Sequence, residues 1–270
     1  THPLRYDAAS DHYQPVSWDS AFAEIGAELK AMDDPDQVVF YMSGRAALET
    51  AYMYGLLARL YGTNNLPDSS NMCHESTSVA LPESIGVPVA TVTLNDLKHT
   101  DGLFFFGQNT GTSSPRMLHE LQAARERGAE IVTFNPLRER GLERFVNPQS
   151  PREMLTPDST VISTQYHQLA IGGDMAAIAG MCKALFAMDD LAIAEGRQRV
   201  LDVAFIEQHT HGFEAFEARI RSYTWEQLER RSGLTRAAME AAATAYARCE
   251  RVIAPYGMGL TQHRHGVQTI

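Results

Sequence analysis

A regular alternation of apolar strands, polar loops and helices near the middle of the chain limits the folds open to it. Residues 101–107 form an apolar run that ends in a glycine, and they predict a buried strand. A polar loop at 108–114 leads into a helix predicted for 115–127, and a second strand is predicted at 131–134. These are the units of a doubly wound parallel sheet. The sequence therefore predicts an α/β fold.

Weaker patterns extend this interpretation towards both ends of the chain. Apolar residues at helical spacing predict further helices, and short apolar runs predict further strands. The helices are expected at 18–32, 48–60, 175–188 and 234–248, and the strands at 37–42 and 252–254. Ser17 and Asp19 are candidate caps of the first helix. Residues 141–160 are rich in Pro, Ser and Thr and are expected to form a long surface loop.

The charge balance and the cysteines exclude several classes of protein. The 270 residues hold 23 Lys and Arg against 33 Asp and Glu, a net charge of −10, so no basic stripe is available for a nucleic-acid backbone. No apolar run is long enough to span a membrane. Three distant cysteines without a CxxC pair argue against a disulfide scaffold, a structural zinc site or an iron–sulfur cluster within this chain. We expect a soluble, cytoplasmic protein that binds neither nucleic acid nor membrane.

Three strand-to-loop transitions combine glycines with small polar side chains. Their candidate ligand-binding residues are Ser43, Gly44 and Arg45; Gly107, Gln108, Asn109 and Ser113; and Gly257, Met258, Gly259 and Gln262. Ligands of open α/β sheets bind beyond the carboxyl ends of the strands, where glycine lets the backbone approach a phosphate and polar groups donate to it. Any one of these loops is equally well explained as a polar turn. Three of them in one chain predict a large phosphorylated ligand.

Two further segments follow at the spacing of a nucleotide-binding fold. Asn135, Pro136 and Arg138 end the second predicted strand, where such folds meet a ribose or a base. The alternative is a capped turn with a solvated arginine. Gly172 and Asp174 open a predicted helix. Asp174 is either a helix cap or an acceptor for the N–H edge of guanine.

The pair Cys73-His74 is the sharpest single feature. A thiolate binds soft metals, and an imidazole accepts or relays a proton near neutral pH. A single cysteine is more often a small buried apolar residue, but this one lies in a polar stretch that is poor core material. Cys182 and Cys249 lie in alanine-rich helical stretches and are interpreted as structural.

Taken in order, these motifs resemble the alpha subunit of molybdopterin-dependent formate dehydrogenases. The collinear pieces are Val16-Ser17-Trp18-Asp19, Ser43-Gly44-Arg45, Gly62-Thr63-Asn64-Asn65, Cys73-His74, Gly107-Gln108-Asn109, Asn135-Pro136-Leu137-Arg138, Gly172-Gly173-Asp174 and Gly257-Met258-Gly259-Leu260-Thr261-Gln262. The stretches 70–75 and 134–140 are similar to its less characterised branch, the formate dehydrogenase-like oxidoreductases. The resemblance covers nearly the whole chain.

The resemblance implies a bis(molybdopterin guanine dinucleotide) cofactor that holds Mo or W. Cys73 would ligate the metal, and His74 would lie near the substrate as a proton relay or electrostatic partner. The glycine loops would hold the pyrophosphates, while Arg138 and Asp174 would hold guanosine ends. The expected reaction is the oxidation of formate to carbon dioxide, with the electrons passing to a partner protein or subunit. The cofactor performs the redox step and the protein orients the reactants.

The resemblance also predicts how the chain is divided. Residues 1–72 and 246–270 would form one discontinuous domain, and 73–245 a Rossmann-like domain inserted in it. The chain starts without Met and stops soon after a glycine-rich segment, so we expect a fragment that binds the cofactor weakly and is inactive alone. A [4Fe–4S] cluster, if any, would lie outside this chain. The motifs do not place the family's formate-binding arginine; Arg264 and His265, which follow the glycine motif, are named as guesses for it.

Other functions stay open at this point. Nitrate-, arsenite- and thiosulfate-type oxidoreductases share the cofactor, although Cys73 followed by His74 favours the formate branch. A scaffold that keeps the fold without the metal has no need of this pair. A hydrolase with Cys73 as its nucleophile and His74 as its base is disfavoured, because adjacent side chains of an extended chain point to opposite sides.

Overall fold

The computed structural model describes residues 2–67 and 69–270. The chain forms two compact units, Thr1–Cys73 and His74–Ile270, and each is described by itself. Among the described residues, no helix combines the length and the apolar character needed to cross a lipid bilayer.

The described residues of the first unit include two short strands and two long helices. β1 (Leu4–Asp7) pairs antiparallel with β2 (His12–Pro15), and α1 (Trp18–Ala31), η1 (Pro35–Gln37) and α2 (Leu48–Tyr61) follow. The predicted helices at 18–32 and 48–60 are confirmed. Ser17 caps α1, since its hydroxyl accepts a hydrogen bond from the Ser20 amide at 3.1 Å.

The strand predicted at 37–42 is wrong. Residues 38–42 carry no regular structure, because no other strand of the described first unit lies beside them. The Phe40 amide instead donates to the Asn65 carbonyl at 2.9 Å. Phe40 is buried between the rings of Tyr54 and Tyr61, so the apolar run contributes to packing without forming a ladder.

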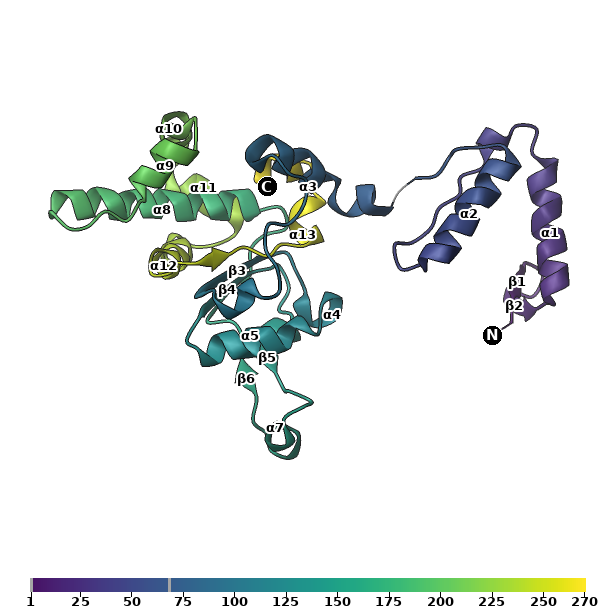
Figure 1. Ribbon diagram of the computed structural model, residues 1–270, viewed down its shortest axis with the longest axis horizontal. Coiled ribbons are helices and arrows are strands. Elements are labelled where there is room, and N and C mark those ends of the chain that lie inside the picture. The colour runs from purple at the N-terminus through teal and green to yellow at the C-terminus, as the bar shows by residue number, and fades with distance from the viewer. Residues whose placement is uncertain (1, 68) are drawn as a thin grey trace. The chain divides into compact units, whose positions relative to one another are not determined.

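The second unit contains a four-stranded sheet in the order β7-β4-β3-β8 (Figure 1). Its strands are β3 (Gly102–Phe106), β4 (Glu130–Phe134), β7 (Gln165–His167) and β8 (Val252–Ile253). All three pairings are parallel. The predicted strands at 101–107, 131–134 and 252–254 are confirmed, and so is the parallel sheet. Because every strand runs the same way, all four carboxyl ends meet at one edge.

Helices cover both faces of this sheet, which explains why β3 and β4 are almost wholly buried and largely apolar. Phe104 and Phe106 pack with α8 (Asp174–Ala194) and α12 (Arg236–Ala247). Leu103 and Phe105 point to the other face and pack with α5 (Met117–Glu126). Figure 1 shows α5 on one side of the sheet and α8 and α12 on the other. The helices predicted at 115–127, 175–188 and 234–248 are thereby confirmed.

Several short helices of the second unit were not expected from the sequence. They are η2 (Asp96–Lys98), α4 (Thr110–Ser113), α9 (Val203–His209), α10 (Phe213–Ser222), α11 (Trp225–Ser232), α13 (Met258–Thr261) and α14 (Gly266–Thr269). α11 begins with a capping box in which Thr224 and Gln227 each bond the other's amide. That Thr-x-x-Gln spacing was a readable signal for the start of a helix.

The long loop predicted at 141–160 is wrong in its detail. The segment folds as α6 (Arg140–Glu143), β5 (Arg144–Phe145), α7 (Pro151–Leu155) and β6 (Thr160–Val161). β5 pairs antiparallel with β6, and Leu142 and Phe145 are buried in the core beside α5. Two buried apolar side chains therefore organise a segment whose composition is that of a loop.

Residues 246–270 belong to the second compact unit. β8 pairs with β3, and the Gly259 amide donates to the Gly107 carbonyl at 3.0 Å. The domain division predicted from the resemblance, in which 246–270 group with 1–72, stays a prediction. Around Gly259 the two backbones are so close that a Cβ would lie 2.6 Å from the Gly107 Cα.

We predict that Gly259→Ala destabilises the full-length protein. The added methyl would force the segments after β3 and β8 apart, at a cost of about 1–3 kcal/mol in the free energy of unfolding. Urea titration measures this change. Gly26→Ala is the matched control, because Gly26 lies inside α1 with no atom within 4 Å of the new Cβ, and alanine is the better helix former there. A Gly259→Ala protein as stable as the parent would contradict this packing.

We also predict that Asp189 stabilises the segment after α8 in a pH-dependent way. Its buried carboxylate accepts bonds from the Arg199 guanidinium at 2.6 Å, the Val200 amide at 2.8 Å and the Leu201 amide at 3.1 Å. Asp189→Ala should lower the free energy of unfolding by about 2 kcal/mol. Glu195→Ala should change it by at most about 0.5 kcal/mol, since the Glu195–Arg197 pair is half exposed.

The pH dependence of the Asp189 effect has a defined sign. The hydrogen bond from Arg199 holds the pKa of the Asp189 carboxyl below its ordinary value of 3.8. The stabilisation is therefore present above that ordinary value and is lost as the pH falls through the lowered pKa of the folded state. Parent and Asp189→Ala unfolding curves should converge in strong acid. A difference that stays constant down to that range would contradict the prediction.

Candidate functional site

The carboxyl edge of the sheet brings two of the predicted glycine loops into contact. The Gly257 amide donates to the Phe106 carbonyl, and the Gly259 amide to the Gly107 carbonyl, each at 3.0 Å. A Cβ at Gly257 would lie 2.9 Å from the Gly107 oxygen and 3.2 Å from the Gln108 Cα. Gly107 itself has a φ of +55°. Glycine is therefore required here by the approach of one loop to the other.

Met258 and Gln262 lie in the same segment after β8, and both are exposed. Two bonds attach this segment to α3 (Ser69–Ile85). The Ser76 hydroxyl donates to the Thr261 carbonyl at 2.7 Å, and the Tyr256 hydroxyl lies 3.2 Å from the Thr77 hydroxyl. The part of α3 that begins at His74 thus lies against the third predicted loop.

The loop after β3 is also bound to the loop after β4. Asn109 caps the short helix α4, accepting from the Thr112 amide at 3.2 Å, while its amide nitrogen donates to the Glu139 carboxylate at 2.7 Å. The Ser113 amide donates to the Asn109 carbonyl at 2.9 Å. Glu139 was not among the sequence candidates, since its role depends on a contact across 30 positions of the chain.

Thr110 is a second residue that sequence analysis missed. It follows Asn109 directly and is fully buried. Its hydroxyl has no hydrogen-bond partner among the described residues. Most buried hydroxyls are paired, so an unpaired one beside the carboxyl edge of a parallel sheet makes Thr110 a candidate contact for a bound group.

Asn135 and Arg138 occupy the end of β4 as predicted, with Pro136 between them. The buried Asn135 side chain donates to the Leu137 carbonyl at 2.7 Å, so it closes the turn. Arg138 is exposed, pairs with Glu143 at 2.5 Å and lies 5.2 Å from the centre of the Tyr166 ring. The Glu143 carboxylate and the Tyr166 ring therefore hold the Arg138 guanidinium in place beyond the carboxyl end of β4.

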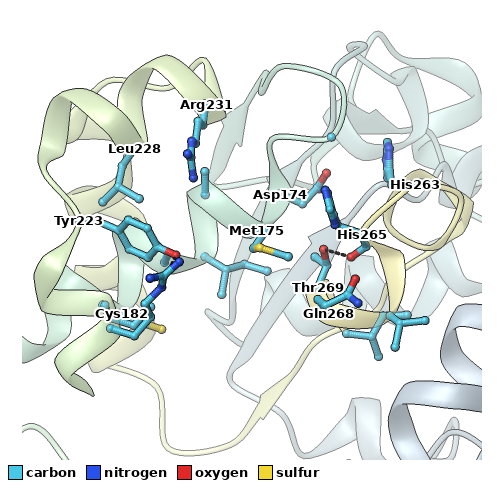
Figure 2. Close-up of a pocket in the computed structure, with 18 of the residues that line it drawn as sticks. Asp174, Met175, Cys182, Tyr223, Leu228, Arg231, His263, His265, Gln268 and Thr269 are labelled. Carbon is cyan, nitrogen blue, oxygen red and sulfur yellow. Dashed lines mark hydrogen bonds between the residues drawn. The ribbon is translucent and has the colours of Figure 1, made fainter. Parts of the chain in front are cut away.

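Asp174 lies in the first turn of α8 and lines a cavity of the second unit, about 1020 Å³ in volume. Gly173 is the N-cap of α8, so Asp174 does not hold the cap position that the sequence allowed for it. Figure 2 shows Asp174 and Met175 between Tyr223, Leu228 and Cys182 on one side and residues of the segment 263–269 on the other. Burial raises the pKa of the Asp174 carboxyl.

Gly172, just before α8, has a φ of +77°, and a Cβ there would lie 3.5 Å from the His263 ring. That ring is bonded in turn to the Gly259 carbonyl. The loop after β8 and the start of α8 are therefore neighbours. The structure brings Gly172 and Asp174 to the same edge as Gly107 and Gly259.

Ser43, Gly44 and Arg45 belong to the first unit and are described with it alone. They form an exposed turn in which the Arg45 amide donates to the Ser43 hydroxyl at 3.3 Å. Their approach to the other candidate residues stays a prediction.

Cys73 and His74 lie within α3, on either side of the boundary between the two units. Both are half-buried. His74 has non-helical dihedral angles (φ −137°, ψ 25°) and kinks the helix. The extended backbone assumed for this pair in the argument against a hydrolase is wrong. No group of three or more His, Cys, Asp or Glu side chains among the described residues forms a metal site, so a metal at Cys73 would need ligands from a cofactor.

The chain is similar in sequence to longer known proteins. Protein YdeP of Escherichia coli (strain K12) is 51% identical over 270 residues, which are 100% of this chain and 36% of that protein. Formate dehydrogenase H of the same organism is 28% identical over 262 residues, 95% of this chain and 33% of that protein. The chain thus spans about a third of the length of these relatives.

The fold is also found in a solved structure. Acetylene hydratase from Pelobacter acetylenicus superposes with a TM-score of 0.60 at 20% identity, covering 96% of this chain and 32% of that one. The model of the family described as molybdopterin oxidoreductase matches residues 4–270. This match over nearly the whole length shows that the chain belongs to the molybdopterin oxidoreductase family.

Proposed function

We propose that this chain supplies part of the cofactor-binding region of a molybdopterin oxidoreductase, and that the cofactor is the bis(guanine dinucleotide) form. The family implies a molybdopterin-type cofactor with Mo or W. The single observation that carries the finer proposal is the convergence of the predicted loops after β3, β4 and β8 on one edge of the sheet. Ligands of parallel α/β sheets bind at that edge.

The residues present fit such a group in two ways. The buried Thr110 hydroxyl lacks a partner among the described residues, next to the capped turn of Asn109. The cavity at Asp174 is large enough for a nucleotide and offers a buried carboxyl group at one wall. A carboxylate suits the two N–H donors of a guanine edge. We assign the pyrophosphate contacts to the loops at 107–113 and 256–262, and guanosine contacts to Asp174 and Arg138.

The proposed catalytic role rests on Cys73 and His74. Cys73 would be the protein ligand of the metal, and His74 would hold or relay the substrate proton. The cofactor, when bound, would supply the two-electron redox chemistry. The bonds from Ser76 and Thr77 to the segment after β8 orient the helix that begins at His74.

Formate is the substrate we propose, with carbon dioxide, one proton and two electrons as products. The support is the order Cys73-His74 and the likeness to formate dehydrogenase H, which is a distant one at 28% identity. Nitrate-, arsenite- or thiosulfate-type chemistry at the same cofactor is the second candidate. An electron-accepting partner and a cytoplasmic location are parts of this proposal that rest on the sequence alone.

We predict that Cys73→Ser removes the metal from the full-length protein. The parent should contain about one Mo or W atom per chain, measured by mass spectrometry of metals. Acid treatment should release about two GMP molecules per chain from the bound cofactor. The serine hydroxyl is a poorer ligand for a soft metal than a thiolate. The matched control is Cys249→Ser, whose thiol lies 3.2 Å from the Ala245 carbonyl at the opposite, amino end of β3.

The outcomes separate two parts of the proposal. A parent without metal and without GMP would contradict the cofactor assignment altogether. A Cys73→Ser protein with unchanged metal and formate oxidation would contradict only the ligand role. Loss of the metal in Cys249→Ser as well would show that the effect is not specific to Cys73.

A further inference from the structure

A second, smaller cavity lies beside β4 and β7 and is lined largely by guanidinium groups. Its volume is about 350 Å³, at the lower end of the range for small-ligand sites, roughly 300–1,000 Å³. The polar residues that line it are Arg138, Arg140, Glu143, Arg144, Ser163 and Tyr166. Of these, only Arg138 was a candidate from the sequence. We call this the arginine cavity.

The charge of the arginine cavity is opposite to that of the chain. Three arginines face one carboxylate, so the lining carries a net charge of 3 − 1 = +2, whereas the whole chain carries −10. Three like charges around one small cavity repel each other, and Glu143 neutralises only one of them. A bound anion with two negative charges would balance the other two.

The backbone around the cavity is held firmly by hydrogen bonds. The Ile162 amide donates to the Glu143 carbonyl and the Ser163 amide to the Leu142 carbonyl, each at 3.0 Å. The Ser163 hydroxyl donates to the same Leu142 carbonyl at 2.6 Å and lies 2.7 Å from the Thr133 hydroxyl. These bonds join α6 and β5 to the strand segment that leads into β7. The backbone that surrounds the cavity is therefore preorganised by hydrogen bonds within the chain.

Tyr166 and Glu143 set the position of one guanidinium. The Tyr166 hydroxyl donates to the Leu137 carbonyl at 2.7 Å and accepts from the Glu139 amide at 2.9 Å, so the turn that carries Arg138 is bound to β7. The ring of Tyr166 then supports the Arg138 guanidinium. Preorganised guanidinium forks are well suited to the oxygens of phosphate.

The other two arginines keep most of their donors available. Arg144 donates from one nitrogen to the Ser159 hydroxyl at 3.1 Å. The Arg140 side chain makes no ion pair with any described residue. An exposed arginine with five donors and no carboxylate partner can donate to an external anion.

From this arrangement we propose that the arginine cavity binds a doubly charged phosphate group, as inorganic phosphate or as the phosphomonoester of a nucleotide. A carboxylate has one charge and two oxygens, and it would satisfy the three guanidiniums less well than a phosphate. A nucleic-acid backbone is excluded by the net charge of −10. Arg138 is shared with the proposed guanosine contacts. Arg140 and Arg144 have no part in those contacts, so their variants test the arginine cavity separately.

The test is a calorimetric titration of the full-length protein, as isolated, with inorganic phosphate, GMP and guanosine. Saturable binding of phosphate or GMP is expected, and guanosine, which lacks the phosphate, should not compete for this site. Arg140→Ala and Arg144→Ala should each weaken binding at least about fivefold, since each removes a charge-assisted hydrogen bond. Binding should also weaken as the salt concentration rises.

Two further variants make the test specific. Glu143→Gln should strengthen phosphate binding, because it removes the carboxylate that competes for Arg138. Arg197→Ala is the matched control: this exposed arginine pairs with Glu195 elsewhere on the second unit and should leave binding unchanged. Thermal unfolding of Arg140→Ala and Arg144→Ala should match the parent, since both side chains are exposed.

Binding of inorganic phosphate would show that the free ion is sufficient, and binding of GMP but not of phosphate would show that the ligand is a nucleotide. Either result supports the proposal if Arg140→Ala and Arg144→Ala weaken the binding. The proposal is overturned if neither probe binds saturably, or if binding survives in both Arg140→Ala and Arg144→Ala. GMP binding that is lost only in Asp174→Asn would place the nucleotide in the other cavity and would also overturn it.

Discussion

The close backbone contact between Gly107 and Gly259 is the constraint on which the site depends. It joins the loop after β3 to the segment after β8, at an approach that leaves no room for a side chain on either residue. Because the four strands are parallel, all their carboxyl ends reach the same edge. The contact therefore turns two loops from distant parts of the sequence into one surface, and the Asn109–Glu139 bond adds the loop after β4.

The two cavities lie beside this surface and differ in character. The cavity at Asp174 is large and partly apolar, with a buried carboxyl group whose pKa is raised by burial. The arginine cavity is small and carries a net positive charge. A carboxyl group in an apolar wall suits the donor edge of a base, while guanidinium groups suit a phosphate. The second unit thus offers a buried carboxyl group in one cavity and guanidinium groups in the other.

Much of the second unit could be predicted from the sequence, because its information is local. β3 and β4 are continuous apolar runs buried on both faces, and α8 carries apolar residues along most of its length. β7 was missed since its three residues, Gln165–His167, have no apolar pattern and depend on pairing with β4. The strand predicted at 37–42 failed for the opposite reason. The run is apolar, but no strand pairs with it among the described residues of its unit.

The site was predicted in part, for the same physical reason. Loop residues such as Gly107, Asn135 and Asp174 could be found because their positions after strands or before a helix are visible in the sequence. Glu139, Thr110 and Tyr166 act through contacts that only the folded chain creates. The kink at His74 was equally hidden, because the segment has no strong helical periodicity on either side.

Hydrogen–deuterium exchange on the full-length protein, with and without its cofactor, tests the central claim most directly. If the carboxyl edge holds the cofactor, the amides of 107–113, 135–138 and 256–262 exchange more slowly in the loaded protein, while those of α9, on the far side of α8 from the sheet, do not change. Equal exchange of the three loops in the loaded and cofactor-free proteins would contradict the account.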